Sequence, residues 1–205
     1  MPSTARISEE RIKELVSTLD SKSSLDREAA WLELKPLGIE AVPHLARAYP
    51  QFRRKEGRLE CVFHSIRFAR VSENAFQLGL TALNDRATLV RYRACGLLAY
   101  SLRLDAIPKL SALISHEDTL TAADARAAID AIEHQNHHYF VDRNHSGSTF
   151  WDVNPGNIPP NFSSPRSQVA PENAPVGAAS LPSSWPHPLH VFLSKFPYFS
   201  KKNIP

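Results

Sequence analysis

The feature that most constrains the fold is a recurring pattern of apolar residues with helical spacing, which is clearest midway along the chain. From Thr88 to about Arg103, apolar side chains recur at intervals of three and four residues. This spacing places them on one face of an α-helix. An Asn84-Asp85 turn precedes this helix. A second helix begins at Pro108, where a proline is tolerated because the first amides of a helix have no helical partner. The stretch therefore predicts two helices joined by a short loop.

The same spacing recurs over the first 135 residues, and no alternating strand pattern interrupts it before residue 139. The predicted helices cover residues 6–20, 25–37, 39–49, 56–70, 72–83, 88–103, 108–114 and 121–132. Ser72 is expected to cap the fifth of these, and Thr121-x-x-Asp124 is a cap-like start for the last. Arg27, Arg58 and Arg91 lie 31 and 33 residues apart. A period in the low thirties, with two helices in each period, indicates an α-solenoid, in which helix pairs bury their apolar faces against neighbouring pairs. The sequence therefore predicts an all-α fold.

The residues of the clearest repeat also resemble a known family. They are Asn84-Asp85 in the turn, Val90-Arg91 at the start of the next helix, Ala94, Leu98, and Ile107-Pro108-x-Leu110. This arrangement resembles a HEAT repeat, and the chain resembles small uncharacterised bacterial HEAT-repeat proteins. The resemblance implies a right-handed α-α superhelix of about four helix pairs over residues 1–138. It gives Asp85, Arg91 and Pro108 structural roles, since the turn aspartate and the early arginine bond between neighbouring HEAT repeats. Asp124 stands where the fourth repeat would carry that arginine, so we expect an incomplete series of these bonds.

Charge and proline divide the chain into two parts of different character. Nineteen of the 21 acidic residues and twenty of the 24 Lys and Arg residues lie between residues 1 and 145, whereas eleven of the 16 prolines follow residue 145. Proline lacks an amide hydrogen and disfavours helices and sheets. Residues 155–205 are therefore predicted to form an extended or disordered Pro-rich tail with an aromatic end.

Residues 139–154 lie between these two parts and are predicted to form a small capping hairpin. Its strands would be Tyr139 to Val141 and Thr149 to Val153, joined by an Asn-His-Ser-Gly turn. Trp151 would help to cover the open apolar end of the helical stack, as a terminal repeat requires. The alternative is a calcium loop that begins at Asp142. That alternative lacks the glutamate required at the twelfth position, where Val153 stands.

A stripe of polar and aromatic residues is the candidate binding surface. Arg93, Tyr100 and Arg103 share a face of one predicted helix, and His64 and Arg67 lie on a comparable face of an earlier one. Arginine and tyrosine make strong, specific contacts at interface centres, so this stripe suits an acidic peptide or a partner's carboxylates. The alternative is an ordinary solvated face with salt bridges between repeats.

A group of histidines near the end of the last helix is the second candidate site. His134, His137 and His138 have helical spacing, and His145 follows. Imidazole nitrogens bind metals, but a polar helix end also favours histidine through the helix dipole. The second interpretation is preferred, so no metal and no cofactor are predicted.

The remaining evidence bears on the class of function. No Ser-His-acid set, phosphate loop or paired-carboxylate motif is present, which favours a non-enzymatic protein. Basic residues are interleaved with acidic ones, which makes nucleic acid an unfavoured partner. Cys61 and Cys95 lie within apolar helical patterns and are predicted to be reduced core residues. No apolar run has the length of a membrane span. The protein is therefore predicted to be cytoplasmic.

The prediction for function is a module that binds another protein on its solenoid surface. The resemblance to small HEAT-repeat proteins implies scaffolds, adaptors or immunity proteins that neutralise a toxin, and an immunity protein is the favoured specific role. The alternative is a nucleic-acid-binding HEAT protein similar to the alkylpurine DNA glycosylases. The sequence does not determine the oligomeric state.

Overall fold

Eight α-helices follow one another in the part of the chain that the computed structural model describes, residues 7–153. They are α1 (Glu9–Thr18), α2 (Ser24–Leu34), α3 (Ala41–Ala48), α4 (Lys55–Ser65), α5 (Glu73–Ala82), α6 (Thr88–Ser101), α7 (Ile107–Ser111) and α8 (Thr119–Glu133). Five short 3-10 helices join or extend them: η1 (Lys35–Glu40), η2 (Tyr49–Gln51), η3 (Ile66–Phe68), η4 (Leu104–Ala106) and η5 (His137–Phe140). No strand occurs among these residues, so the predicted all-α class is confirmed. The predicted tail, residues 155–205, lies outside the described residues.

Local side-chain chemistry explains where the helices begin and end. The hydroxyl of Ser72 accepts a hydrogen bond from the amide of Ala75 and so caps α5, as predicted. The predicted cap of the last helix, at Thr121, is wrong. Asp118 caps α8 instead by accepting from the amide of Leu120, because its carboxylate lies just before the first turn, whereas Thr121 already lies within that turn. At the end of α6, Leu102 adopts a left-handed conformation with φ of 56°, which stops the helix.

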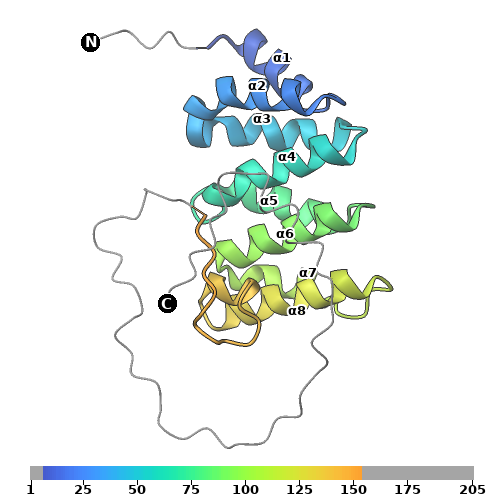
Figure 1. Ribbon diagram of the computed structural model, residues 1–205, viewed down its shortest axis with the longest axis vertical. Helices are drawn as coiled ribbons and strands as arrows, with labels where there is room; N and C mark the ends of the chain where they lie inside the picture. Colours follow the sequence, from blue (N-terminus) through green and yellow to red (C-terminus); the bar gives the residue numbers. More distant parts are fainter. Residues whose placement is uncertain (1–6, 154–205) are drawn as a thin grey trace, which may run out of the picture. The chain divides into compact units, whose positions relative to one another are not determined.

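The helices pack as consecutive pairs, with α1 against α2, α3 against α4, α5 against α6 and α7 against α8 (Figure 1). The even-numbered helices α4, α6 and α8 also contact one another in that order. Helix α6 lies at the centre of this arrangement, because α4, α5, α8 and η5 all contact it. Its side chains are consequently buried on almost every side, polar ones included. The packing therefore covers more of α6 than its apolar stripe alone predicts.

Ion pairs join neighbouring helix pairs in two places, and the first of them is buried. Arg58 at the start of α4 binds Asp85, with Nε to Oδ2 at 2.5 Å and Nη2 to Oδ1 at 3.0 Å. The hydroxyl of Tyr49 donates a third bond to Asp85 at 2.6 Å. One helix pair later, Nη2 of Arg91 binds Oδ2 of Asp118 at 2.6 Å. Each arginine thus reaches the aspartate that lies 27 residues after it.

The side chains of Asp85 and Arg91 do not bind each other directly. Arg91 donates to the main-chain oxygen of Asp85 at 2.7 Å, while the carboxylate of Asp85 belongs to Arg58. Asp124, which stands where the resemblance would place an arginine, has an ion-pair partner of its own. Nη2 of Arg143, which lies beyond α8, binds Oδ1 of Asp124 at 2.6 Å. The acidic residue in α8 thus pairs with the C-terminal segment, which we define as residues 137–151.

The C-terminal segment does not form the predicted hairpin. Residues 137–140 form the 3-10 helix η5, and no strand pairing follows. Side chains satisfy the backbone here in place of a partner strand. Asn136 accepts from the amide of His138, and the carboxylate of Asp142 accepts from the amides of Ser146 and Gly147. The expected covering role is nevertheless present, because Phe140 and Trp151 are 2% and 6% exposed and the segment contacts α6 and α8.

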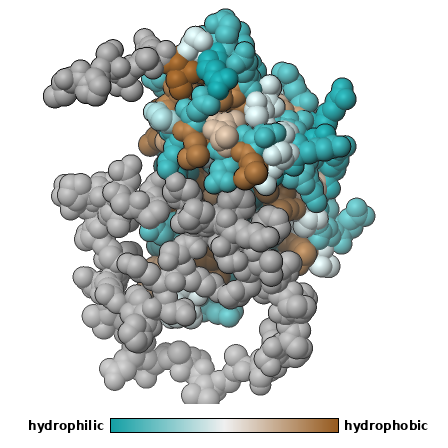
Figure 2. All heavy atoms as spheres, turned by 45° about the horizontal axis from the view of Figure 1, so that its top comes forward, coloured by the Kyte–Doolittle hydropathy of each residue, from teal (hydrophilic) through white to brown (hydrophobic). Residues whose placement is uncertain are grey.

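The surface of the helical unit and its thiols agree with the sequence-based expectations. Cys61 and Cys95 are buried free thiols. None of the described helices has the length and apolar character needed to cross a membrane. Hydrophobic residues are interspersed with hydrophilic ones on the face drawn in Figure 2. Single exposed apolar side chains such as Leu25 and Val71 are usual for a folded protein and do not by themselves mark an interface.

Candidate functional site

The candidate functional site is a cluster of charged and aromatic side chains on α2, α4 and the adjoining η3, which we call the His64 cluster: Arg27, Trp31, Glu60, His64 and Arg67. Nε2 of His64 lies 3.0 Å from Oε2 of Glu60, one helical turn earlier in α4. Nε of Arg27 in α2 lies 3.6 Å from the other oxygen of the same carboxylate. The ring of Trp31 stacks on the ring of His64, with centroids 3.5 Å apart and planes 10° from parallel. Two helices from neighbouring pairs thus build one site.

The electrostatics of the cluster follow from its burial and from an excess of cations. Burial lowers the pKa of His64, the Glu60 carboxylate opposes this shift, and the charges of Arg67 and Arg93 lower the pKa further. Burial tends to raise the pKa of Glu60, but the hydrogen bond with His64 and the nearby charge of Arg27 hold it below its ordinary value. His64 is therefore neutral near pH 7, and Glu60 is ionised. The cluster thus holds one carboxylate, that of Glu60, and two guanidinium groups, those of Arg27 and Arg67.

The sequence spacing of the helix pairs could have identified the members of this cluster that were not predicted, Arg27, Trp31 and Glu60. Trp31 and His64 lie 33 residues apart, as do Arg27 and Glu60. This interval matches the period of the helix pairs, so such residues occupy equivalent positions on neighbouring helices. The helical spacing of residues 25–37 places Trp31 with Leu34 on one apolar face, and this spacing by itself does not connect Trp31 with His64.

Arg93 and Tyr100 lie on the same helix, but they do not form the exposed stripe that the sequence suggested. They are 7% and 9% exposed. The guanidinium carbon of Arg93 lies 4.9 Å from the centre of the Phe63 ring, which places it beside the His64 cluster. The ring of Tyr100 instead contacts the edges of His137 and Trp151. The C-terminal segment therefore covers the Tyr100 end of the predicted stripe.

Arg103 is separated from the other predicted binding residues. It follows the left-handed Leu102 and turns toward α5 and η4. Its guanidinium group binds Glu73 and Asp105, each at 2.5 Å, and lies 3.5 Å from the centre of the Phe76 ring. Its hydrogen bonds with these two carboxylates raise its pKa. Arg103 thus joins α5 to the loop after α6 and is not part of the His64 cluster.

Gly96 provides the position on α6 against which the C-terminal segment packs. A Cβ atom at this glycine would lie 3.1 Å from Cε1 of Phe140 and 3.3 Å from Cη2 of Trp151. Both distances are shorter than ordinary van der Waals contact between carbon atoms. The missing side chain therefore allows the two aromatic rings to approach the helix backbone.

This packing predicts different effects for two substitutions of Gly96. Gly96→Val should destabilise the protein by about 1–3 kcal/mol, because the added methyl groups displace Phe140 and Trp151 from a well-packed site. Gly96→Ala should change the free energy of unfolding by less than about 1 kcal/mol, because the higher helix propensity of alanine offsets a smaller clash. Urea unfolding of both variants measures the difference. Equal stability of the two variants would show that the rings do not press on this position.

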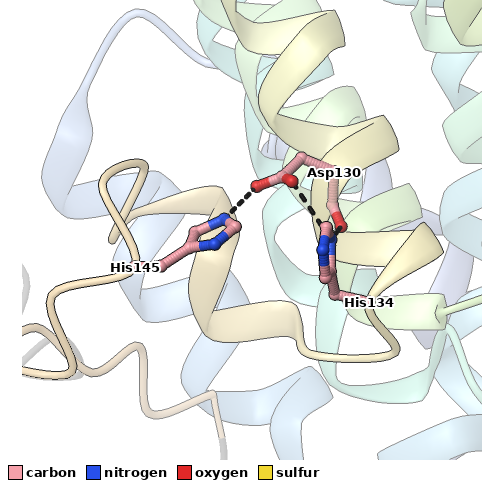
Figure 3. A group of neighbouring side chains, drawn as sticks. All are labelled: Asp130, His134 and His145. Carbon is pink, nitrogen blue, oxygen red and sulfur yellow. Dashed lines mark hydrogen bonds and ion pairs between the residues drawn. The ribbon is translucent and has the colours of Figure 1, made fainter. Parts of the chain in front are cut away.

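The four histidines near the end of α8 fall into two separate groups. His137 and His138 bind the backbone of Trp151. Nε2 of His137 lies 3.2 Å from the carbonyl oxygen of Trp151, and the amide of Trp151 donates to Nδ1 of His138 at 3.0 Å. His134 and His145 instead approach the carboxylate of Asp130 from two sides (Figure 3). The structure therefore does not bring the four predicted residues to one point.

Comparison with models of known protein families and with curated protein sequences finds no match for this chain.

Proposed function

We propose that this chain is a non-enzymatic protein-binding module, built as a HEAT-like α-solenoid, that seats an acidic segment of a partner protein on the His64 cluster. The successive pairing of eight helices and the two Arg-Asp pairs at equal sequence spacing support the solenoid assignment. The expectation of an exposed surface over Arg93, Tyr100 and Arg103 is replaced by a smaller site centred on Trp31, His64 and Arg67.

The observation that carries this proposal is the charge imbalance of the cluster. The guanidinium groups of Arg27 and Arg67 outnumber the single carboxylate of Glu60. Among the described residues, Arg67 takes part in no ion pair. A carboxylate of the partner would pair with Arg67, and arginine binds carboxylates with directed, charge-assisted hydrogen bonds.

Trp31 supplies the apolar component of the same site. Its indole is held in a fixed orientation by the stack on His64, so little side-chain entropy is lost when a partner packs against it. Tryptophan and arginine are the residue types that most often dominate interface energies. An acidic segment that also carries an apolar residue is therefore the expected ligand. A toxin whose active surface is occluded in this way is one partner of that description.

Charge reversal at Arg67 provides the test. Arg67→Glu should reduce partner binding at least tenfold, because a partner carboxylate would then face a like charge. Arg47→Glu is the matched control, since Arg47 is exposed on α3 and its side chain forms no ion pair with the described residues. Tagged wild-type and variant proteins are used for affinity capture from the source organism with quantitative mass spectrometry. The affinity of each purified pair is then measured by calorimetry.

Three outcomes separate the alternatives. A partner that binds wild-type protein and Arg47→Glu but not Arg67→Glu supports the proposal. A partner that binds all three proteins equally contradicts it, because the contact must then lie elsewhere. Salt-dependent binding to DNA, without a protein partner, would favour a nucleic-acid-binding HEAT protein instead.

A further inference from the structure

A second cluster, which we call the Asp130 cluster, lies at the end of α8 and consists of Asp130, His134 and His145. Nε2 of His145 lies 2.6 Å from Oδ2 of Asp130, and Nδ1 of His134 lies 3.1 Å from Oδ1. The three ligand atoms lie within 4.8 Å of one another. Figure 3 shows the two imidazoles pointing at one carboxylate, one from the end of α8 and the other from the loop after η5.

The loop holds His145 in this position by several independent contacts. The amide of His145 donates to the main-chain oxygen of Asp142 at 3.0 Å. The ring of Tyr139 stacks on the His145 ring, with centroids 3.7 Å apart and planes 12° from parallel. The backbone of His145 has φ of 51°, a left-handed conformation that is strained for a non-glycine residue. A strained and stacked histidine that faces a carboxylate is an arrangement suited to ligand binding.

We propose that the Asp130 cluster binds a divalent transition-metal ion of the zinc type, which fastens the loop after η5 to the end of α8. Two imidazole nitrogens and one carboxylate oxygen form a common set of three protein ligands for zinc, with water in the fourth position. The cluster is open enough for this, because the side chains of Asp130, His134 and His145 are 31%, 52% and 36% exposed.

The geometry requires only a small rearrangement. Zinc–ligand distances of about 2.0–2.1 Å in a tetrahedral site separate ligand atoms by about 3.3 Å. The two measured separations, 2.6 and 3.1 Å, are slightly shorter than this. His134 must also give up a contact of 2.9 Å between Nδ1 and the main-chain oxygen of Asp130. The ion would replace one proton or more held among the three groups, so affinity should fall as pH decreases.

Calorimetric titration with zinc sulfate at pH 7.5 tests the proposal on the full chain, with any histidine tag removed. Wild-type protein should bind one equivalent at the Asp130 cluster. Asp130→Asn and His145→Gln should each weaken this binding more than tenfold, because each removes one of three ligands. His44→Gln is the matched control, since His44 on α3 takes part in no ion pair of the described residues and should not affect the binding.

A second measurement locates the ion. Zinc should slow hydrogen exchange of amides in residues 139–147 of the wild-type protein and should have no such effect in Asp130→Asn. Circular dichroism verifies that both variants remain helical. Absence of zinc binding by the folded wild-type protein, or binding that Asp130→Asn and His145→Gln leave unchanged, would overturn the proposal. Neither outcome bears on the His64 cluster, because the two clusters share no residue.

Discussion

Arg58→Met is expected to destabilise the protein by about 3–5 kcal/mol, because it leaves the carboxylate of Asp85 buried without its cation. The side chains of Arg58 and Asp85 are 8% and 3% exposed, so water cannot readily replace the lost guanidinium group. Burial tends to raise the pKa of Asp85, but Arg58 and Tyr49 hold it below its ordinary value. The expected loss is a large part of the stability of a typical domain, about 5–15 kcal/mol.

An exposed ion pair provides the matched control for this substitution. Arg11 binds Glu33 through two close contacts, but the side chains are 47% and 52% exposed. Arg11→Met should therefore have little effect on stability, because water screens an exposed ion pair. Chemical unfolding measures both variants, and a double-mutant cycle with Asp85→Asn isolates the coupling between Arg58 and Asp85. The explanation fails if Arg58→Met costs no more than Arg11→Met.

Acidification is expected to release the C-terminal segment from the helices, and His137 is the residue responsible. Its two nitrogens have different partners. Nε2 donates to the carbonyl oxygen of Trp151, and Nδ1 accepts from Nη2 of Arg70 at 3.2 Å. These partners define a neutral imidazole with its proton on Nε2. A second proton on Nδ1 would remove the bond from Arg70 and place two cations side by side.

The direction of the pH dependence follows from the pKa of His137. Burial, then the neighbouring His138, then Arg70, lower it from 6.5 to about 3 in the folded protein. Between pH 3 and pH 6.5, His137 binds a proton when the C-terminal segment is released but not when the segment is packed. Packing should therefore weaken as pH falls from 6.5 toward 3, by about 1.4 kcal/mol, or tenfold in the equilibrium constant, for each pH unit.

Hydrogen exchange of the Trp151 amide measures this effect, because that amide donates to His138 only while the segment is packed. Protection factors remove the intrinsic pH dependence of exchange. His137→Gln keeps a donor for the Trp151 carbonyl but has no titrating group, so its protection factor should fall less steeply, by about one decade per pH unit relative to wild type. Amides of α5 serve as the internal control. Identical slopes in the two proteins would assign the pH dependence to another group.

The helices were predictable from sequence because they depend on local regularities. The three- and four-residue spacing of apolar side chains located all eight, and the serine cap at Ser72 was identified correctly. The cap at Asp118 was missed, because several nearby residues can cap a helix. Which of them does so depends on where the first turn begins in the folded chain. The hairpin was predicted wrongly, because alternation of side chains does not reveal that Asn136 and Asp142 satisfy the backbone.

The candidate sites were predictable only in part. His64, Arg67 and Arg93 were identified, and the structure brings them to one region. Tyr100 and Arg103 were assigned to the same surface, but the first lies under Trp151 and the second binds Glu73. Asp130 was not considered as a ligand, because its neighbour His145 comes from a loop 15 residues later, and helical spacing does not reveal the path of that loop.

The sequence alone determined the helical class, the order of the helices and the repeat period, because each of these depends on residues close together in the chain. The tertiary structure decided which polar residues are available for binding. Arg93 looked exposed beside Tyr100 in the helical pattern, but α4, α8 and the C-terminal segment bury both. Burial of a polar group depends on every element that packs against it, and periodicity within one helix carries no information about those elements.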